Sequence, residues 1–274
     1  MQLAVVFSSI KIRKIEMGSI VGHIGRRTVT AIDHILNLAA FTYRLFTLIV
    51  KQPREGRVLV RRAIMEQVYF TAVQALTIIV PIALISGSML IFQFGKLSGQ
   101  YDLGKLLVLL IVRELGPIIT AILVILRSAT AVTIEISYMN VLHEIEAVEM
   151  SGMDPMRIIC LPRLIGITSA ILCLFIVFDV VSIIGGYAIV WMATEIRLGN
   201  FFYQIAKAIT ASDITAGLVK AMFFGIAITV TSLYRGFETQ KQITLIPVQC
   251  SRAAVECFFF CLILNVLISV LFYV

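Results

Sequence analysis

Two adjacent residues of opposite charge, Arg113 and Glu114, interrupt a long apolar segment, Leu103–Leu126. A charged side chain inside a membrane span is costly and usually faces a cavity or a partner. Arg113 follows Asp102 by eleven residues, which is about 16 Å of helix and places the pair near the middle of a bilayer. The pair could therefore bind or gate a substrate, or it could be a structural ion pair that fixes helix packing.

The backbone directly after this pair is expected to be irregular. Gly116 is followed by Pro117, which has no amide hydrogen, so the carbonyl group of Arg113 loses its usual helical partner. Irregular backbone at membrane depth is tolerated only where protein or water covers it, and transporters build binding sites at such breaks. Charge and a helix break thus coincide in this short segment.

The composition requires a membrane around these residues. The 274-residue chain is 59% hydrophobic and only 14% charged, whereas soluble domains are about 45–50% apolar and roughly 25% charged. Soluble, disordered and disulfide-rich proteins are therefore excluded. The net charge of +7 is better explained by basic residues at a cytoplasmic membrane rim than by nucleic-acid binding, because no polar module is long enough for the latter.

Five segments are apolar and long enough to span a bilayer, which needs about 20 residues. The sequence therefore predicts an all-α integral membrane protein with five transmembrane helices. The expected spans are Thr71–Phe94, Leu103–Leu126, Leu164–Thr194, Ile214–Tyr234 and Cys257–Val274.

The segment before the first span, Thr28–Val50, has a different pattern. Its polar residues fall in one stripe about 100° wide, which is typical of an amphipathic helix lying in the membrane interface. A tilted span whose polar stripe faces a neighbour is the alternative. The stripe consists of Thr30, Asp33, Asn37, Arg44, Thr47 and Lys51.

The distribution of basic residues predicts the orientation. Lysine and arginine are in excess before the first span and in the loop between the fourth and fifth spans, and basic loops stay in the cytoplasm. The N-terminus and the loop between the second and third spans are then cytoplasmic. An odd number of spans places the C-terminus outside, on the side away from the cytoplasm.

The cytoplasmic loop 139–163 contains a second group of interest. A short helix is expected there, with acidic residues off its apolar face and with Gly152 as its C-terminal stop. Asp154 and Pro155 are typical of the N-cap and first residue of the next helix. The loop could be a docking surface for a cytoplasmic protein or an ordinary solvated loop. Its acidic helix residues are Glu144, Glu146 and Glu149.

Catalytic and metal sites are not expected. The five cysteines show no C-x-x-C spacing and the three histidines are scattered. The segment Gly99–Lys105 is close to a phosphate-binding loop, but Leu106 replaces the required serine or threonine. Asp179, in the third span, could act as a proton relay or pair with a cation from another span.

The segment from Arg113 to Gly166 resembles the MlaE/YrbE family, the permease subunits of MCE-type ABC lipid transporters. The similarity rests on Arg-Glu-Leu-Gly-Pro at 113–117, on Arg127 and Glu135, on the acidic stretch that ends at Asp154–Pro155, and on Pro-Arg at 162–163. The number of spans and the amphipathic N-terminal helix agree with this family.

The resemblance implies a homodimeric, non-catalytic permease in the cell inner membrane, which moves phospholipid to or from a periplasmic MCE-domain hexamer and so maintains outer-membrane lipid composition. A separate cytoplasmic ABC ATPase would bind ATP and Mg, and a STAS-domain subunit could complete the complex. Arg113, Glu114 and Leu115 match positions that line the lipid cavity, beside the helix break at Gly116 and Pro117. The loop helix that would dock on the ATPase includes Glu144, Glu146, Glu149, Gly152 and Asp154.

These expectations divide the chain into an N-terminal cytoplasmic extension (1–27), an interfacial or elbow helix region (28–66) and a five-span permease domain (67–274). A stand-alone ion- or proton-coupled carrier is the alternative. It would use Arg113, Glu114, Asp179 and Lys220 as its intramembrane charges. Inverted repeats would favour such a carrier, but five spans divide poorly into two halves.

Overall fold

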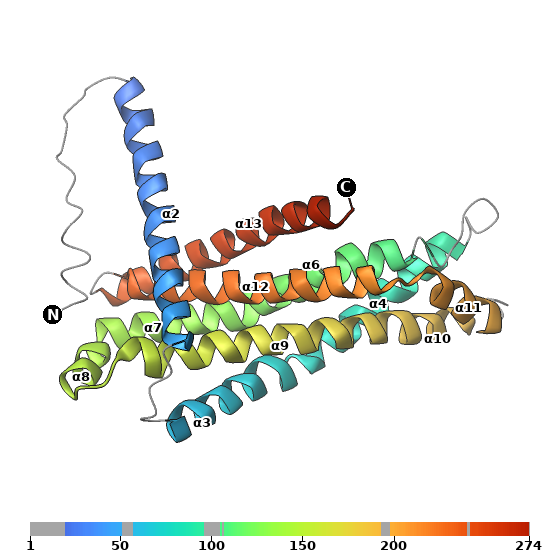
Figure 1. Ribbon diagram of the computed structural model, residues 1–274, viewed down its shortest axis with the longest axis horizontal. Coiled ribbons are helices and arrows are strands. Elements are labelled where there is room, and N and C mark those ends of the chain that lie inside the picture. Colours follow the sequence, from blue (N-terminus) through green and yellow to red (C-terminus); the bar gives the residue numbers. More distant parts are fainter. Residues whose placement is uncertain are drawn as a thin grey trace. The chain divides into compact units, whose positions relative to one another are not determined.

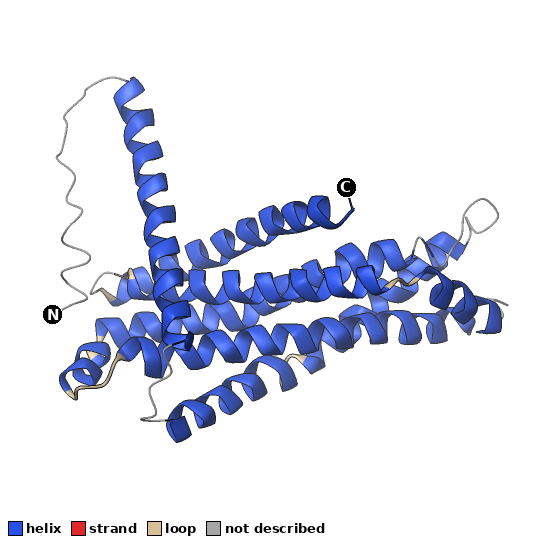
Figure 2. Cartoon of the chain, viewed as in Figure 1, coloured by secondary structure: helices blue, strands red, loops and turns tan. Residues whose placement is uncertain are grey.

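The protein is helical throughout the residues that the computed structural model describes, which are 20–50, 57–95, 105, 107–192, 198–239 and 242–273 (Figure 1). No strand occurs within these ranges, as the colouring by secondary structure shows (Figure 2). The all-α class is therefore confirmed. Residues 1–19 of the expected N-terminal extension lie outside the described residues.

Five helical segments of the described chain are long and apolar enough to cross a membrane, which confirms the predicted number. They are span 1 (Val60–Gln93), span 2 (Val108–Val141), span 3 (Met156–Trp191), span 4 (Ala211–Phe237) and span 5 (Ile243–Phe272). Their 27 to 36 residues correspond to about 40–54 Å of helix, more than the ~30 Å hydrocarbon core. Span 1 accordingly begins at Val60, ahead of the expected Thr71.

Spans 1 to 3 are not uniform α-helices, because π-helical turns interrupt them. Such turns are rare in proteins overall, and those that occur often lie at functional sites. Span 1 is built from α3 (Arg57–Val68), η1 (Tyr69–Val73) and α4 (Leu76–Gly95); span 2 from η2 (Val108–Leu115), α6 (Gly116–Val124), η3 (Ile125–Ala129) and α7 (Thr130–Val141); span 3 from η4 (Met156–Cys160), α9 (Leu161–Val180), η5 (Val181–Gly185) and α10 (Gly186–Trp191).

Span 4, the helix α12 (Ala211–Phe237), is the centre of the bundle. It packs against α7, against α9 and, most extensively, against α13 (Ile246–Tyr273), the helix that follows the single turn η6 (Ile243–Leu245). Its side chains Ala221, Phe224, Ile228 and Leu233 are fully buried. The short helices α8 (Glu144–Met150) and α11 (Leu198–Ala208) lie at opposite ends of this bundle (Figure 1). The connection that contains α8, between spans 2 and 3, is called here the α8 loop. The helix α11 was not predicted from the sequence.

Spans 1 and 3 approach each other unusually closely. A Cβ atom added at Gly87 would collide with the carbonyl oxygen of Ser182, and one added at Gly186 would lie 2.7 Å from the carbonyl carbon of Gly87. Small residues allow this contact, because membrane helices pack through close backbone approach rather than through hydrophobic burial.

The segment α2 (Ile20–Val50) is a continuous helix of 31 residues. This confirms a helix over the expected Thr28–Val50 and extends it toward the N-terminus. It is not among the five helices that are apolar enough to span a membrane. Among the described residues, those up to Phe41 form one unit and those from Thr42 onward form another, so the placement of α2 in the membrane interface stays a prediction.

The close contact between spans 1 and 3 predicts a destabilising substitution. Gly87→Ala should lower the free energy of unfolding by about 1–3 kcal/mol, because its methyl group overlaps the Ser182 backbone. Thermal unfolding in detergent measures this. Gly199→Ala is the control, since a Cβ there meets open space. Equal melting temperatures for the two variants would contradict the proposed close packing.

Candidate functional site

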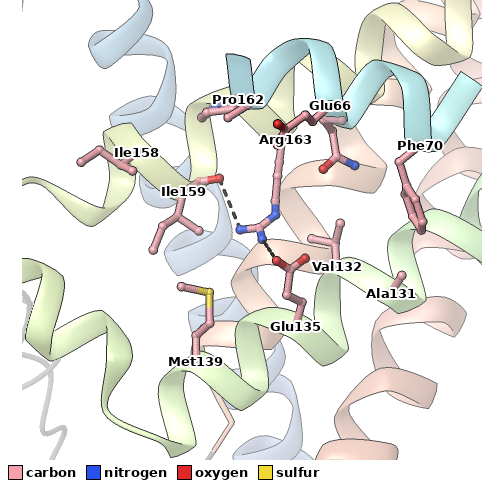
Figure 3. A pocket seen from close by; sticks show the side chains of 12 residues that line it. Glu66, Phe70, Ala131, Val132, Glu135, Met139, Ile158, Ile159, Pro162 and Arg163 are labelled. Atoms are coloured by element: carbon pink, nitrogen blue, oxygen red, sulfur yellow. Dashed lines mark hydrogen bonds and ion pairs between the residues drawn. The ribbon is translucent and has the colours of Figure 1, made fainter. Parts of the chain in front are cut away.

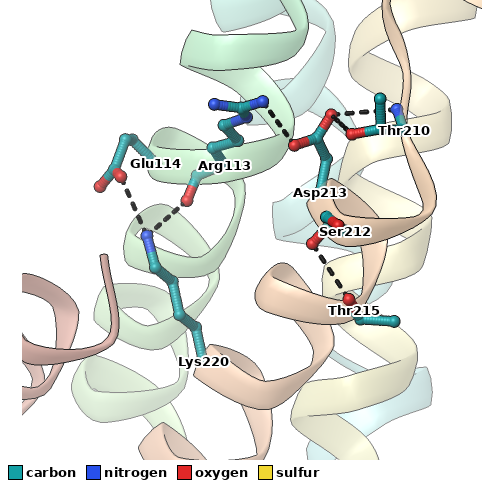
Figure 4. Close-up of polar contacts among 7 residues, drawn as sticks. All are labelled: Arg113, Glu114, Thr210, Ser212, Asp213, Thr215 and Lys220. Atoms are coloured by element: carbon teal, nitrogen blue, oxygen red, sulfur yellow. Dashed lines mark hydrogen bonds and ion pairs between the residues drawn. The ribbon is translucent and has the colours of Figure 1, made fainter. Parts of the chain in front are cut away.

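Arg113 and Glu114 are close in sequence but do not pair with each other. A nitrogen of the Arg113 guanidinium (Nη2) lies 2.6 Å from Oδ1 of Asp213, and the ammonium of Lys220 lies 3.0 Å from Oε1 of Glu114 (Figure 4). Adjacent residues on a helix point in different directions, so each of the two reaches its own partner on α12.

Arg113 lies near the start of span 2, and its depth in a bilayer stays a prediction. It lies 28 residues from Val141, the end of span 2 at the α8 loop. That separation is about 42 Å of helix. Arg113 and Glu114 thus lie toward the end of the bundle opposite α8 rather than at its middle.

Lys220 occupies the hydrogen-bonding position that Pro117 leaves open. Its side chain is fully buried, and Nζ donates to the carbonyl oxygen of Arg113 at 2.7 Å as well as to Glu114. Here the π-helical turn η2 ends at Leu115, and the amide of Gly116 bonds to the carbonyl of Ile111. The carbonyl of Arg113, to which Pro117 cannot donate, thus accepts a hydrogen bond from a side chain of another span.

Glu114 connects three spans. Besides Lys220 of α12, its carboxylate accepts hydrogen bonds from Asn265 Nδ2 and Ser269 Oγ of α13, both at 2.8 Å. Its side chain remains 32% exposed. Three donors therefore fix the orientation of the Glu114 carboxylate, which is still partly accessible from outside the protein.

Asp213 is fixed by hydrogen bonds other than its contact with Arg113. It lies in the first turn of α12, where its Oδ2 accepts hydrogen bonds from the backbone amide and the hydroxyl of Thr210, at 3.0 and 2.7 Å. An acidic residue in this turn is also favoured by the helix dipole. Asp213 is fully buried, whereas the Arg113 side chain is 28% exposed. The guanidinium of Arg113 is thus partly exposed, and its counter-ion, the carboxylate of Asp213, is buried and fixed in position.

The four charges together form what is called here the ion-pair cluster: Arg113, Glu114, Asp213 and Lys220. It is electrically neutral, and its two exposed members are one cation and one anion. Such an arrangement can bind a zwitterionic or polar group without leaving a charge uncompensated when that group departs. Leu115 is half-buried beside the cluster. Within the described ranges no group of three histidine, cysteine or acidic residues is placed to hold a metal ion.

Sequence reasoning missed three members of this site. Asp213 was taken as a loop residue, and Asn265 and Ser269 were not considered. A usable signal was present in each case. Asp213 and Lys220 are seven residues apart and Asn265 and Ser269 are four apart, so each pair lies on one face of its helix.

Asp179 does not belong to the ion-pair cluster. In α9 its Oδ1 atom is buried and has no hydrogen-bond partner in the described part of the chain. A Cβ atom at Gly116 would collide with this oxygen, so Gly116 leaves the space that Asp179 occupies. Among the described residues no lysine or arginine forms an ion pair with Asp179, so its role stays a prediction.

The α8 loop has the predicted local structure. The helix α8 covers Glu144–Met150, and Gly152 ends it with a φ of +81°. The carboxylate of Asp154 accepts a hydrogen bond from the amide of Met156 at 3.1 Å, as an N-cap does.

The acidic residues of α8 differ in exposure. Ile145 is buried, whereas Glu144 and Glu146 are exposed and Glu149 is half-buried. The helix therefore packs through its apolar face and leaves acidic groups accessible.

Comparison with known proteins gives a consistent result. The family model described as Permease MlaE matches residues 64–271. The intermembrane phospholipid transport system permease protein MlaE of Haemophilus influenzae is 29% identical over 215 residues, 76% of this chain and 80% of that protein. A probable ABC transporter permease protein of Rickettsia conorii is 26% identical over 259 residues, 93% of this chain and 98% of that protein.

A more distant similarity covers part of the chain. The chloroplastic protein TRIGALACTOSYLDIACYLGLYCEROL 1 of Arabidopsis thaliana is 26% identical over 147 residues, which is 54% of this chain and 42% of that protein.

The burial of Lys220 predicts a large effect on stability. Lys220→Met should lower the free energy of unfolding by about 3–5 kcal/mol, because Glu114 loses its cation and the Arg113 carbonyl loses the hydrogen bond from Nζ. The double variant Glu114→Gln/Lys220→Met should recover part of this loss, since no carboxylate is then left without its cation. Denaturation in detergent provides the measurement.

The exposed Lys207 of α11 supplies the matched control. Lys207→Met should change stability by no more than about 0.5 kcal/mol. A Lys220→Met protein as stable as this control would show that the ammonium does not hold spans 2 and 4 together.

Proposed function

The chain belongs to the MlaE permease family, and from this membership and the geometry of the ion-pair cluster we propose that it binds phospholipid at Arg113 and Glu114 and passes it through an ATP-driven transporter. The family assignment makes it a multi-pass lipid ABC permease. The stand-alone carrier, the alternative considered from the sequence, is not retained.

The observation that carries the proposal is the partial exposure of Arg113 and Glu114 beside an apolar surface. Both keep about a third of their side chains accessible. On α13, the helix that supplies Asn265 and Ser269, the apolar side chains Ile263, Val266, Leu267, Val270 and Leu271 are more than half exposed. A charged recess next to an apolar helix face matches the polar head group and acyl chains of a phospholipid, with Leu115 beside the head group.

A second copy of the chain would complete this site. In the most apolar stretch of span 5 only 22% of the residues are buried, so most of α13 faces outward. Pairing two such faces around the ion-pair cluster would enclose a cavity and shield the charges from lipid tails. We therefore propose a homodimer in which each copy supplies one charged recess to a common lipid chamber.

The α8 loop is the proposed contact with the ATPase. Its acidic residues Glu144 and Glu146 are exposed on a helix that packs by its other face. Oε2 of Glu146 lies 2.9 Å from Nδ1 of His143, and a basic surface could contact both carboxylates from their exposed side. The cytoplasmic ATPase subunit would bind ATP and Mg and drive the permease through α8, with Glu149, Gly152 and Asp154 fixing the shape of the loop.

The remaining assignments follow the family resemblance. They are an inner-membrane location with a cytoplasmic N-terminus and a periplasmic C-terminus, a periplasmic MCE-domain hexamer as lipid donor or acceptor, and a STAS-domain subunit. Transport between the inner membrane and the MCE partner would maintain the lipid composition of the outer membrane. The Haemophilus relative is named an intermembrane phospholipid transport system permease protein, which supports transport between membranes as the proposed role.

Removing the guanidinium should impair transport without loss of the fold. Arg113→Gln combined with Asp213→Asn keeps the buried site neutral, and should reduce ATP-driven phospholipid transport in proteoliposomes about tenfold or more, the value of one charge-assisted hydrogen bond. Arg113→Lys should retain more activity. Unchanged transport by the neutral double variant, at normal membrane levels, would refute the site.

Reversing the charge of α8 should uncouple the ATPase. Glu144→Arg with Glu146→Arg should reduce co-purification of the ATPase while leaving lipid binding intact, because the acidic surface is replaced by a basic one. Adding positive charge at the exposed Gln204 of α11, as Gln204→Arg, is the control. Full recovery of the ATPase with the doubly reversed α8 would argue against this docking surface.

A further inference from the structure

A cavity lies at the α8 end of the bundle, remote from the ion-pair cluster. Its volume is about 410 Å³, within the ~300–1,000 Å³ range of small-molecule sites. Three spans form it: span 1 through α3 and η1, span 2 through α7, and span 3 through η4 and the start of α9 (Figure 3). It is called here the three-span cavity.

The three-span cavity has apolar walls and a charged end. Phe70, Val132, Met139, Ile158 and Ile159 provide the apolar surface. The polar lining residues are Glu66, Gln67, Glu135 and Arg163.

Arg163 is the polar group that this site is built around. Its side chain is only 11% exposed, and Nη2 lies 2.6 Å from Oε1 of Glu135 while Nη1 donates to the carbonyl of Ile159 at 3.4 Å (Figure 3). Glu135 itself is 59% exposed. A buried guanidinium thus lies behind an accessible carboxylate.

The charge pattern selects one class of ligand. Each carboxylate of the lining has a guanidinium partner, because Glu135 pairs with Arg163 and Glu66 pairs with Arg62 at 3.0 Å. The site is therefore close to neutral, and a ligand with a single net charge would leave that charge uncompensated. A head group with both an ammonium and a phosphate complements both carboxylates and Arg163. The ammonium can donate to Glu135 and Glu66, and the phosphate can accept from Arg163.

The depth of the cavity agrees with a lipid head group. Glu66 lies just before the first charge-free residues of span 1, Glu135 and Met139 lie in the last two turns of span 2, and Arg163 follows the first turn of span 3. The polar lining is therefore at the level where the apolar segments begin or end, which is the head-group layer.

From these observations we propose that the three-span cavity binds the head group of an amine-bearing zwitterionic phospholipid from the leaflet on the α8 side. Two of its walls, α7 and η4, are the segments that lead into and out of the α8 loop. An occupied cavity holds these two segments together, so it also stabilises α8 in one position. This site goes beyond the transport site at Arg113, and each can fail without the other.

Photo-crosslinking in the full-length protein tests the proposal. A benzoylphenylalanine replaces Met139, and the protein is reconstituted in vesicles of equal parts phosphatidylethanolamine and phosphatidylglycerol. Mass spectrometry of the irradiated peptide should show an adduct mainly of phosphatidylethanolamine. Glu135→Gln should reduce the preference for this lipid about tenfold, because one charge-assisted hydrogen bond is lost.

Two further variants make the result specific. Ala131→Trp fills the cavity and should abolish the adduct, whereas Ala206→Trp, at an exposed position of α11, should not. Arg113→Gln combined with Asp213→Asn should leave the adduct unchanged, which separates this site from the transport site.

Three outcomes would overturn the proposal. Equal labelling of both lipids would remove the head-group selectivity. An adduct to a peptide of this chain would show that the protein itself fills the cavity. Absence of any lipid adduct in a monodisperse Met139 variant would show that no lipid enters.

Discussion

A single buried ammonium group connects the helix break to the charges around it. Lys220 donates one hydrogen bond to the carbonyl that Pro117 leaves without a partner and another to Glu114. In hydrocarbon, an unsatisfied carbonyl or an unpaired carboxylate would each be costly. Because one side chain of α12 satisfies both, the irregular turn of span 2 becomes a fixed contact between spans 2 and 4. Asn265 and Ser269 extend this contact to span 5.

The buried members of the ion-pair cluster determine how the exposed members can be used. Asp213 and Lys220 are inaccessible, whereas Arg113 and Glu114 retain partial exposure. The exposed charges are therefore held in position by partners that do not themselves meet a ligand. A neutral, preorganised recess of this kind can accept and release a polar head group with little rearrangement, because neither state leaves a bare charge.

Span 2 links the two ends of the bundle that carry charge. Its first turns contain Arg113 and Glu114, and its last helix, α7, contains Glu135 and leads into α8. Two π-helical segments, η2 and η3, lie along it. A displacement of α8 thus acts on the same helix that bears the proposed transport site, and the Arg163–Glu135 ion pair ties that helix to span 3 at the α8 end.

The sequence by itself determined the features that depend on near neighbours in the chain. Composition and length required five spans, Gly152 and Asp154 defined the ends of the α8 loop, and Pro117 predicted an unpaired carbonyl at Arg113. Patterns in the sequence did not identify the ion-pair and hydrogen-bond partners of Arg113 and Glu114. Asp213, Asn265 and Ser269 lie 100 or more residues from the charges they meet, so no pattern of near neighbours points to them.

Only the tertiary structure could decide those contacts, as well as the position of Arg113 along the bundle. Neighbouring side chains diverge by about 100° around a helix, so their partners depend on which helices pack beside them.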